Sequence, residues 1–191
     1  MVAFNKNDSI NKKENVMGFL KKLKDTLGPK DYTVMTPTEL LGLNDAELST
    51  AISDRTLSGT YGEPVADMLK RFSGARRVYY ILHTYDILVG IGKKRGDYCL
   101  EKDKDIFPGL LPALDEIGAY QNKQLLESFA EKYNLDLNHP NEEVFEKLRM
   151  KNTDKKSLID EFRDGYDEIL GQEDELDSCL MVYIRQHIEE F

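Results

Sequence analysis

The chain has 191 residues, of which 40% are hydrophobic and 32% charged, with a formal net charge of −9 at pH 7. This composition excludes a disordered chain and is typical of one globular domain. The apolar runs are far shorter than the roughly 20 residues of a membrane span, and the N-terminus lacks the apolar core of a secretory signal. We therefore predict a cytoplasmic protein that has no membrane segment.

The negative net charge also limits the classes of macromolecule that we expect the protein to bind. Direct binding to nucleic acid needs clustered Lys and Arg, which a chain of net charge −9 does not favour. A basic protein partner suits it better. The two cysteines, Cys99 and Cys179, are far apart and form no Cys/His cluster at ligand spacing. We predict that they are reduced, and we predict neither a metal nor a cofactor.

Residues 1–30 are predicted to form a polar, lysine-rich arm that contains a short basic amphipathic helix. The apolar residues of this helix recur at helical spacing, at Val16, Phe19, Leu20, Leu23 and Leu27, and Gly28-Pro29 ends the pattern. Such a helix can lie on an anionic membrane, but docking on protein is the favoured interpretation. The helical globular domain is expected over residues 31–191.

Three short helices are predicted before residue 75. Thr36-Pro37-Thr38-Glu39 has the capping residues that begin a helix, and Asn44-Asp45 begins the next. Pro64 is expected in the first turn of the third helix, which Gly74 is expected to end.

Residues Ala75 to about Gly90 form the most apolar stretch and are predicted to be the central core helix. Aromatic and β-branched residues are abundant there, so periodicity leaves open a buried strand pair over Val78–Leu82 and Ile87–Gly92. The glycines and basic residues that follow, at 90–96, lack both GxxxxGK[ST] and GxGxxG. They are predicted to form a surface turn rather than a phosphate loop.

The second half of the chain is also helical by pattern. Helices are predicted over 108–117 and 121–133, and their short connection indicates an antiparallel hairpin. A charged helix is expected over Glu142–Met150, and Asp177–Phe191 closes the chain with one apolar face. The acidic stretch between these two helices is described next. With it, the predicted elements form an all-α, single-domain bundle of eight to nine helices.

The acidic stretch Ser157–Leu180 has nine acidic residues and one basic residue, a net charge of −8. Over residues 158–170 its apolar side chains, Phe162 among them, share one helical face, and five acids lie opposite. Those five give about one charge per 2.7 Å of helix axis, against about one per 1.7 Å in duplex DNA. We predict a partner-binding acidic face composed of Asp160, Glu161, Asp164, Asp167, Glu168, Glu173, Asp174, Glu175 and Asp177.

Two blocks resemble a known family. Ala113-Leu114-Asp115-Glu116-Ile117-Gly118-Ala119 and the terminus Tyr183-Ile184-Arg185-Gln186-His187-Ile188-Glu189-Glu190-Phe191 are similar to blocks of the bacterial DNA-mimic protein family. The similarity covers roughly residues 75–191. It departs at Val89-Gly90-Ile91-Gly92, where that family usually has an Asn-Gly-Gly turn. The resemblance implies an all-helical fold and, in some members, imitation of duplex DNA to occupy a DNA-binding protein.

No catalytic motif stands out, and we predict that the protein is not an enzyme. His83, His139 and His187 lie in no HExxH and beside no cysteine. His187 and Glu190 form an i, i+3 pair on the last helix, but half-buried packing is the favoured interpretation of both His187 and His83. The leading hypothesis is an acidic module that binds a basic, possibly DNA-binding, protein. The alternatives are an antidote that neutralises a toxin and, in third place, an enzyme.

Overall fold

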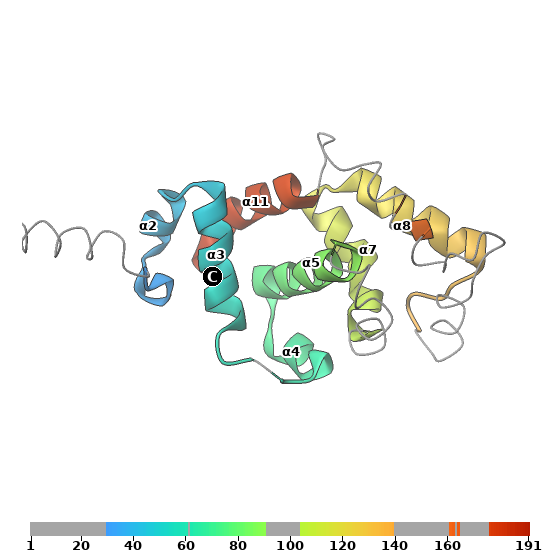
Figure 1. Ribbon diagram of the computed structural model, residues 1–191, viewed down its shortest axis with the longest axis horizontal. Coiled ribbons are helices and arrows are strands. Elements are labelled where there is room, and N and C mark those ends of the chain that lie inside the picture. The colour runs from blue at the N-terminus through green and yellow to red at the C-terminus, as the bar shows by residue number, and fades with distance from the viewer. Residues whose placement is uncertain (1–29, 61, 91–103, 140–160, 163, 165–175) are drawn as a thin grey trace, which may run out of the picture. The chain divides into compact units, whose positions relative to one another are not determined.

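The computed structural model describes residues 30–60, 62–90, 104–139, 161, 162, 164 and 176–191. Seven α-helices lie in these residues (Figure 1): α2 (Pro37–Leu41), α3 (Asp45–Leu57), α4 (Val65–Arg71), α5 (Gly74–Gly90), α7 (Phe107–Ile117), α8 (Tyr120–Tyr133) and α11 (Leu176–Gln186). Three short 3-10 turns accompany them: η1 (Tyr32–Val34), η2 (Lys104–Ile106) and η3 (Ile188–Glu190). The described part of the chain has no strand, and none of its helices is long and apolar enough to cross a bilayer.

The chain divides into two compact units, Met1–Met35 and Thr36–Phe191. The described residues of the first unit contain η1, where the carboxylate of Asp31 accepts a hydrogen bond from the backbone N–H of Thr33 at 3.0 Å. All seven α-helices belong to the second unit. The second unit therefore carries the sites discussed below.

The all-α prediction is confirmed, and residues 74–90 form one helix, so the alternative of buried strands there is wrong. The predicted count of eight to nine helices is not reached, because the described residues hold seven α-helices. The predicted helices over residues 16–27 and 142–150 lie outside those residues. Gly74 is a further correction, since it begins α5, whereas α4 ends at Arg71.

Local sequence signals account for the helix ends. Thr36 and Glu39 form a capping box at the start of α2, with Thr36 N–H donating to the Glu39 carboxylate at 2.7 Å. The side chain of Asn44 accepts from the N–H of Glu47 at 3.0 Å and caps α3. Gly118 ends α7 in the left-handed conformation with φ 79°. These caps fix where each helix begins or ends before any tertiary contact forms.

The core of this unit is built around α5, which packs on α7 and α11. Leu82 of α5, Leu110 and Leu114 of α7 and Ile184 of α11 are fully buried. Gly109 allows α7 to approach α5 closely, since a Cβ there would lie 2.7 Å from Cδ1 of Ile81. Burying four such side chains contributes about 1.5–3 kcal/mol each. This packing sets the position of α5, from which the functional side chains project.

The C-terminal segment connects α5, α7, α2 and α3. Tyr183 OH donates to the carboxylate of Glu116 on α7 at 2.6 Å. Arg185 donates to the carbonyl oxygen of Leu41, the last residue of α2, to that of Leu43 in the α2–α3 connection, and to the carboxylate of Asp45 at 2.6 Å. A basic side chain thus satisfies the Leu41 carbonyl, which the end of the helix leaves without an intrahelical partner.

The last turn docks on the N-terminus of α5. Glu190 accepts a hydrogen bond from Ala75 N–H at 2.8 Å, Arg76 donates to the backbone carbonyl oxygen of Phe191, and the ring of Phe191 packs edge-on against Tyr79. Gly74, with φ +53°, makes room for the Glu190 carboxylate, because a Cβ on Gly74 would lie 2.2 Å from Glu190 Oε2. Glycine is therefore required here by both backbone conformation and space.

Replacing Gly74 with Ala should destabilise the protein more than the matched variant Gly59→Ala. Gly59 also has positive φ, +74°, but nothing lies within 4 Å of a Cβ there. Both variants incur the cost of a left-handed alanine, about 1–2 kcal/mol, and only Gly74→Ala also displaces Glu190. Chemical denaturation would measure the two free energies of unfolding. Equal losses would show that the Glu190 contact contributes nothing.

The hydrogen bond from Ala75 N–H, and then that with His187, holds the pKa of Glu190 below its ordinary value of 4.5. A lowered pKa in the folded state stabilises the fold above pH 4.5, and this stabilisation is lost as the pH falls through the folded pKa. We therefore expect Glu190→Gln to reduce the free energy of unfolding at pH 7 by up to about 1 kcal/mol. The difference from the wild type should shrink toward pH 3.

Denaturation at both pH values would measure this difference. Glu189→Gln, an exposed acid on the same turn, is the control for the loss of one negative charge. A difference between wild type and Glu190→Gln that stays constant between pH 7 and pH 3 would contradict the assignment.

Candidate functional site

The predicted acidic residues occupy two different places as far as the structure describes them. Glu161, Asp164 and Asp177 lie in the described residues. The other six predicted site residues lie outside them: Asp160, Asp167, Glu168, Glu173, Asp174 and Glu175. The described residues therefore do not test whether the nine acids form one surface, and their shared face stays a prediction.

Glu161 is held by α8. It accepts hydrogen bonds from Lys132 Nζ and from Tyr133 OH, so a cation of the same molecule already pairs with its charge. The neighbouring Phe162 is 3% exposed and packs edge-on against Phe129, with ring centroids 4.9 Å apart. The predicted inward direction of Phe162 is thus confirmed, whereas Glu161 is less available to a partner than its sequence suggests.

Asp177 lies on α11, where it lines a cleft between α3, α5 and α11. The cavity has a volume of about 410 Å³ and is lined by Asp45, Ala46, Ser49, Tyr79, His83, Asp86, Asp177, Leu180, Met181 and Ile184. Three carboxylates from three helices thus surround one opening, and the apolar side chains of α11 form a wall beside them. We call this cavity the acidic cleft.

His83 and Tyr79 form one wall of the acidic cleft. Their rings are stacked, with centroids 5.4 Å apart and planes 11° from parallel. Burial lowers the pKa of His83, and the negative charge of Asp177 partly opposes this shift. Burial also raises the pKa of Tyr79 to about 12. At neutral pH both side chains are therefore uncharged, and they add no positive charge to the cleft.

The carboxylates of the cleft differ in how they are engaged. Asp45 is in an ion pair with Arg185 at 2.6 Å, although its side chain is 70% exposed. Asp177 is exposed at the first turn of α11. The exposed carboxylate of Asp177 thus places negative charge at the solvent side of the cleft.

The described residues do not assemble a metal site, since no group of three or more His, Cys, Asp or Glu there could hold an ion. Ser49 and His83 line the same cleft, but no hydrogen bond joins them in the described structure. A serine nucleophile would need a base within hydrogen-bond reach. The chemistry that the arrangement best supports is recognition of a cation with an apolar stem.

The predicted pair of His187 with Glu190 is confirmed. His187 Nδ1 lies 3.0 Å from Glu190 Oε1, and the His187 ring packs against Tyr183 with centroids 4.3 Å apart. Its side chain is 38% exposed, which agrees with the predicted half-buried histidine. Because Glu190 also binds Ala75 N–H, this pair belongs to the anchoring of the last turn.

Sequence reasoning missed the acidic cleft, because its carboxylates come from residues 45, 86 and 177. It also missed a second cavity at the start of α5, lined by Arg55, Arg71 and Arg76 together with Thr56, Ser58, Phe72, Ser73 and Glu190. Neither cavity has a contiguous motif, and only the packing of α5 brings its residues together.

Comparison of the chain with protein-family models, with curated proteins and with solved structures finds no match. The resemblance to the DNA-mimic family therefore stays a prediction based on two short blocks. The function has to be argued from the geometry of the cavities themselves.

Replacing Asp177 with Asn should lower the pKa of His83 further, because the Asp177 charge now favours the protonated imidazole. The expected shift is small, since Asp177 is exposed and solvent screens its charge. NMR titration of the His83 ring protons would measure it. Asp67→Asn on α4, an exposed acid paired with Lys70, should leave the pKa of His83 unchanged. An equal shift in both variants would contradict a specific Asp177–His83 interaction.

Proposed function

We propose that the protein binds a basic segment of a partner protein and places a Lys or Arg side chain of that segment in the acidic cleft. The observation that carries this proposal is the convergence of Asp45, Asp86 and Asp177 around one cavity. Carboxylates on three separate helices are held at fixed positions by the core. A preorganised site of this kind binds a cation with less loss of side-chain entropy than flexible surface acids do.

The apolar wall of the cleft supports this ligand class. Leu180 and Ile184 are 8% and 0% exposed, and with Met181 they line the cavity beside the carboxylates. A Lys or Arg side chain has an aliphatic stem that packs on apolar surface and a charged end that seeks carboxylates. A small hydrated metal ion would gain nothing from contact with this apolar wall.

His83 gives the cleft a dependence on pH. Its lowered pKa keeps the imidazole neutral near pH 7, so that it does not repel a bound cation. Below its folded pKa the ring becomes positive and repels a bound cation. Binding of a basic ligand should therefore weaken as the pH falls through the folded pKa of His83.

A labelled Lys/Arg-rich peptide is the probe for the cleft. We expect the double variant Asp86→Asn/Asp177→Asn to bind it about tenfold more weakly than the wild type, since each exposed charge pair contributes up to about 1 kcal/mol. Fluorescence anisotropy would measure both dissociation constants, and the affinity of the wild type should fall with increasing salt.

The matched control is Asp67→Asn/Asp136→Asn, which removes the same charge from two exposed acids that do not line the cleft. If the control loses as much affinity as the cleft variant, the general acidity of the surface binds the peptide. If the wild type shows no salt-dependent binding, the proposal is wrong.

Two more specific kinds of partner are compatible with this proposal: a DNA-binding protein and a toxin. Imitation of duplex DNA would use the predicted face Asp160–Glu175 beside the cleft residue Asp177. In that case duplex DNA should release a DNA-binding partner from the complex. An antidote role would instead give a complex with a toxin, such as a nuclease, whose activity falls on binding. A complex insensitive to both DNA and salt would exclude the DNA-mimic role.

A further inference from the structure

Three aromatic rings in contact join the last turn of the chain to the acidic cleft. The ring of Phe191 packs edge-on against Tyr79, with centroids 5.9 Å apart and planes at 86°. Tyr79 in turn is stacked on His83, with centroids 5.4 Å apart. Tyr79 and His83 line the cleft, whereas Phe191 does not. An effect of Phe191 on the cleft therefore has a physical route through the other two rings.

The middle ring of this series, Tyr79, is enclosed on several sides. Tyr79 is 2% exposed and Phe191 is 6% exposed. The hydroxyl of Tyr79 forms a hydrogen bond with the side chain of Ser53 on α3. Because protein interiors are close-packed, a ring in such a position moves only when its neighbours move. The position of Tyr79 is thus set by α3 and by the last turn together.

The last turn is itself held by polar contacts that lie outside the cleft. The Glu190 carboxylate accepts from Ala75 N–H at 2.8 Å and lies 3.0 Å from Nδ1 of His187. Arg76 donates to the backbone carbonyl oxygen of Phe191. These contacts place the Phe191 ring at a defined position against α5. Release of the last turn would therefore remove one of the groups that enclose Tyr79.

The ring at the cleft end of the series, His83, is half-buried and sensitive to its surroundings. Burial lowers its pKa, and the charge of Asp177 on α11 partly opposes this shift. Asp45 of α3, in an ion pair with Arg185, and Asp86 of α5 line the same cleft. The stacked ring of Tyr79 contributes to the burial of His83. A looser stack would expose the imidazole to water and raise its pKa toward the ordinary value of 6.5.

We propose that Phe191 and Tyr79 are positioning residues of the acidic cleft, which hold the His83 ring in place as part of its wall. While the last turn is docked, His83 stays packed on Tyr79 and is neutral near pH 7. When the last turn is released, His83 gains contact with water and is protonated more readily, which opposes a cation in the cleft. By linkage, a bound cation and the docked last turn stabilise each other. This effect on a ligand rests on the proposed function, whereas the coupling of the rings does not.

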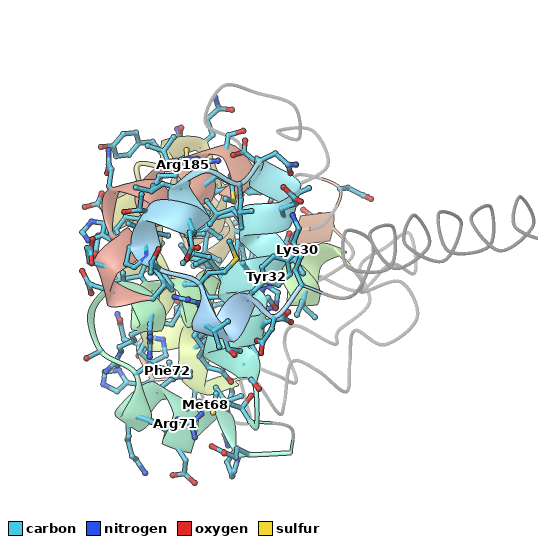
Figure 2. All side chains as sticks on the ribbon, turned by 90° about the vertical axis from the view of Figure 1, so that its left-hand side faces the viewer. Lys30, Tyr32, Met68, Arg71, Phe72 and Arg185 are labelled. Carbon is cyan, nitrogen blue, oxygen red and sulfur yellow. The ribbon has the colours of Figure 1, made fainter. Side chains whose placement is uncertain are left out.

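NMR titration of the His83 ring protons in the full chain, without ligand, tests the coupling. Phe191→Leu should raise the pKa of His83 toward 6.5. The matched control is Phe72→Leu, since Phe72 is 8% exposed and its ring contacts Tyr80, the neighbouring tyrosine of α5, at 5.5 Å. Figure 2 shows Phe72 beside Arg71, at the opposite end of this face from Arg185. Both variants should lower the thermal midpoint, but only Phe191→Leu should change the titration of His83.

A double-mutant cycle tests the route through Tyr79. Tyr79→Leu removes both ring contacts and should raise the pKa of His83 by itself. Adding Phe191→Leu to that variant should then cause no further shift, because Phe191 acts through the ring that is already missing. Tyr79→Phe retains both ring contacts and loses only the hydrogen bond with Ser53. Its titration of His83 should stay closer to that of the wild type than the titration of Tyr79→Leu does.

The labelled Lys/Arg-rich peptide tests the consequence for a ligand. At the pH that protonates half of the His83 rings in Phe191→Leu, this variant should bind the peptide about twofold more weakly than the wild type, since half of its molecules have a neutral ring. A wild type that binds no peptide, together with a shifted His83 titration in Phe191→Leu, would refute the proposed function and support the positioning of His83.

Three results would overturn the positioning role. The first is an unchanged pKa of His83 in Phe191→Leu. The second is an equal shift in Phe72→Leu, which would indicate a general loosening of α5. The third is a further shift when Phe191→Leu is added to Tyr79→Leu, which would show that Phe191 acts on His83 by a route other than Tyr79.

Discussion

The contact between the Glu190 carboxylate and Ala75 N–H determines how the second unit closes. It joins the last turn of the chain to the first turn of α5, residues that are 115 positions apart. The missing Cβ of Gly74 leaves room for the carboxylate in this position, and its φ of +53° favours glycine. The anion also lies at the positive end of the α5 dipole, where a negative charge is stabilising. This contact thus joins the start of α5 to the C-terminal segment and adds to the packing of α5 on α7 and α11.

The rest of the C-terminal segment extends this anchoring to other helices. Tyr183 reaches α7 and Arg185 reaches the α2–α3 connection. Since α11 packs on both α5 and α7, the segment that comes last in the sequence links elements that come first.

Both cavities follow from this arrangement. Arg76 in the first turn of α5 lines the second cavity, and Asp86 toward the other end of the same helix lines the acidic cleft. The α5 dipole disfavours a cation at its start and an anion near its end. Each charged side chain therefore lies where the helix dipole is unfavourable, so neighbouring groups must stabilise it. For Arg76, Glu190 and the backbone carbonyl oxygen of Phe191 provide part of this stabilisation.

The sequence predicted local features well and the sites poorly, for a physical reason. Caps at Thr36, Asn44 and Gly118 are decided within a few residues, and the apolar length of residues 75–90 decided the core helix. Glu161 shows where this reasoning fails. Periodicity placed it on a helix face with other acids, but its pairing with Lys132 depends on how two separate segments pack. The acidic cleft and the second cavity at the start of α5 depend entirely on such packing.

Net charge and local charge act on different length scales, and this distinction bears on how the acidic cleft would select a ligand. At physiological salt the field of the net charge of −9 fades beyond about 8 Å, so it favours the approach of a basic partner without selecting where that partner binds. Only carboxylates held close to one another, as Asp45, Asp86 and Asp177 are around one cavity, can select the position of a cationic side chain. Because added salt weakens both the long-range attraction and the local one, it should lower the rate of association as well as the affinity.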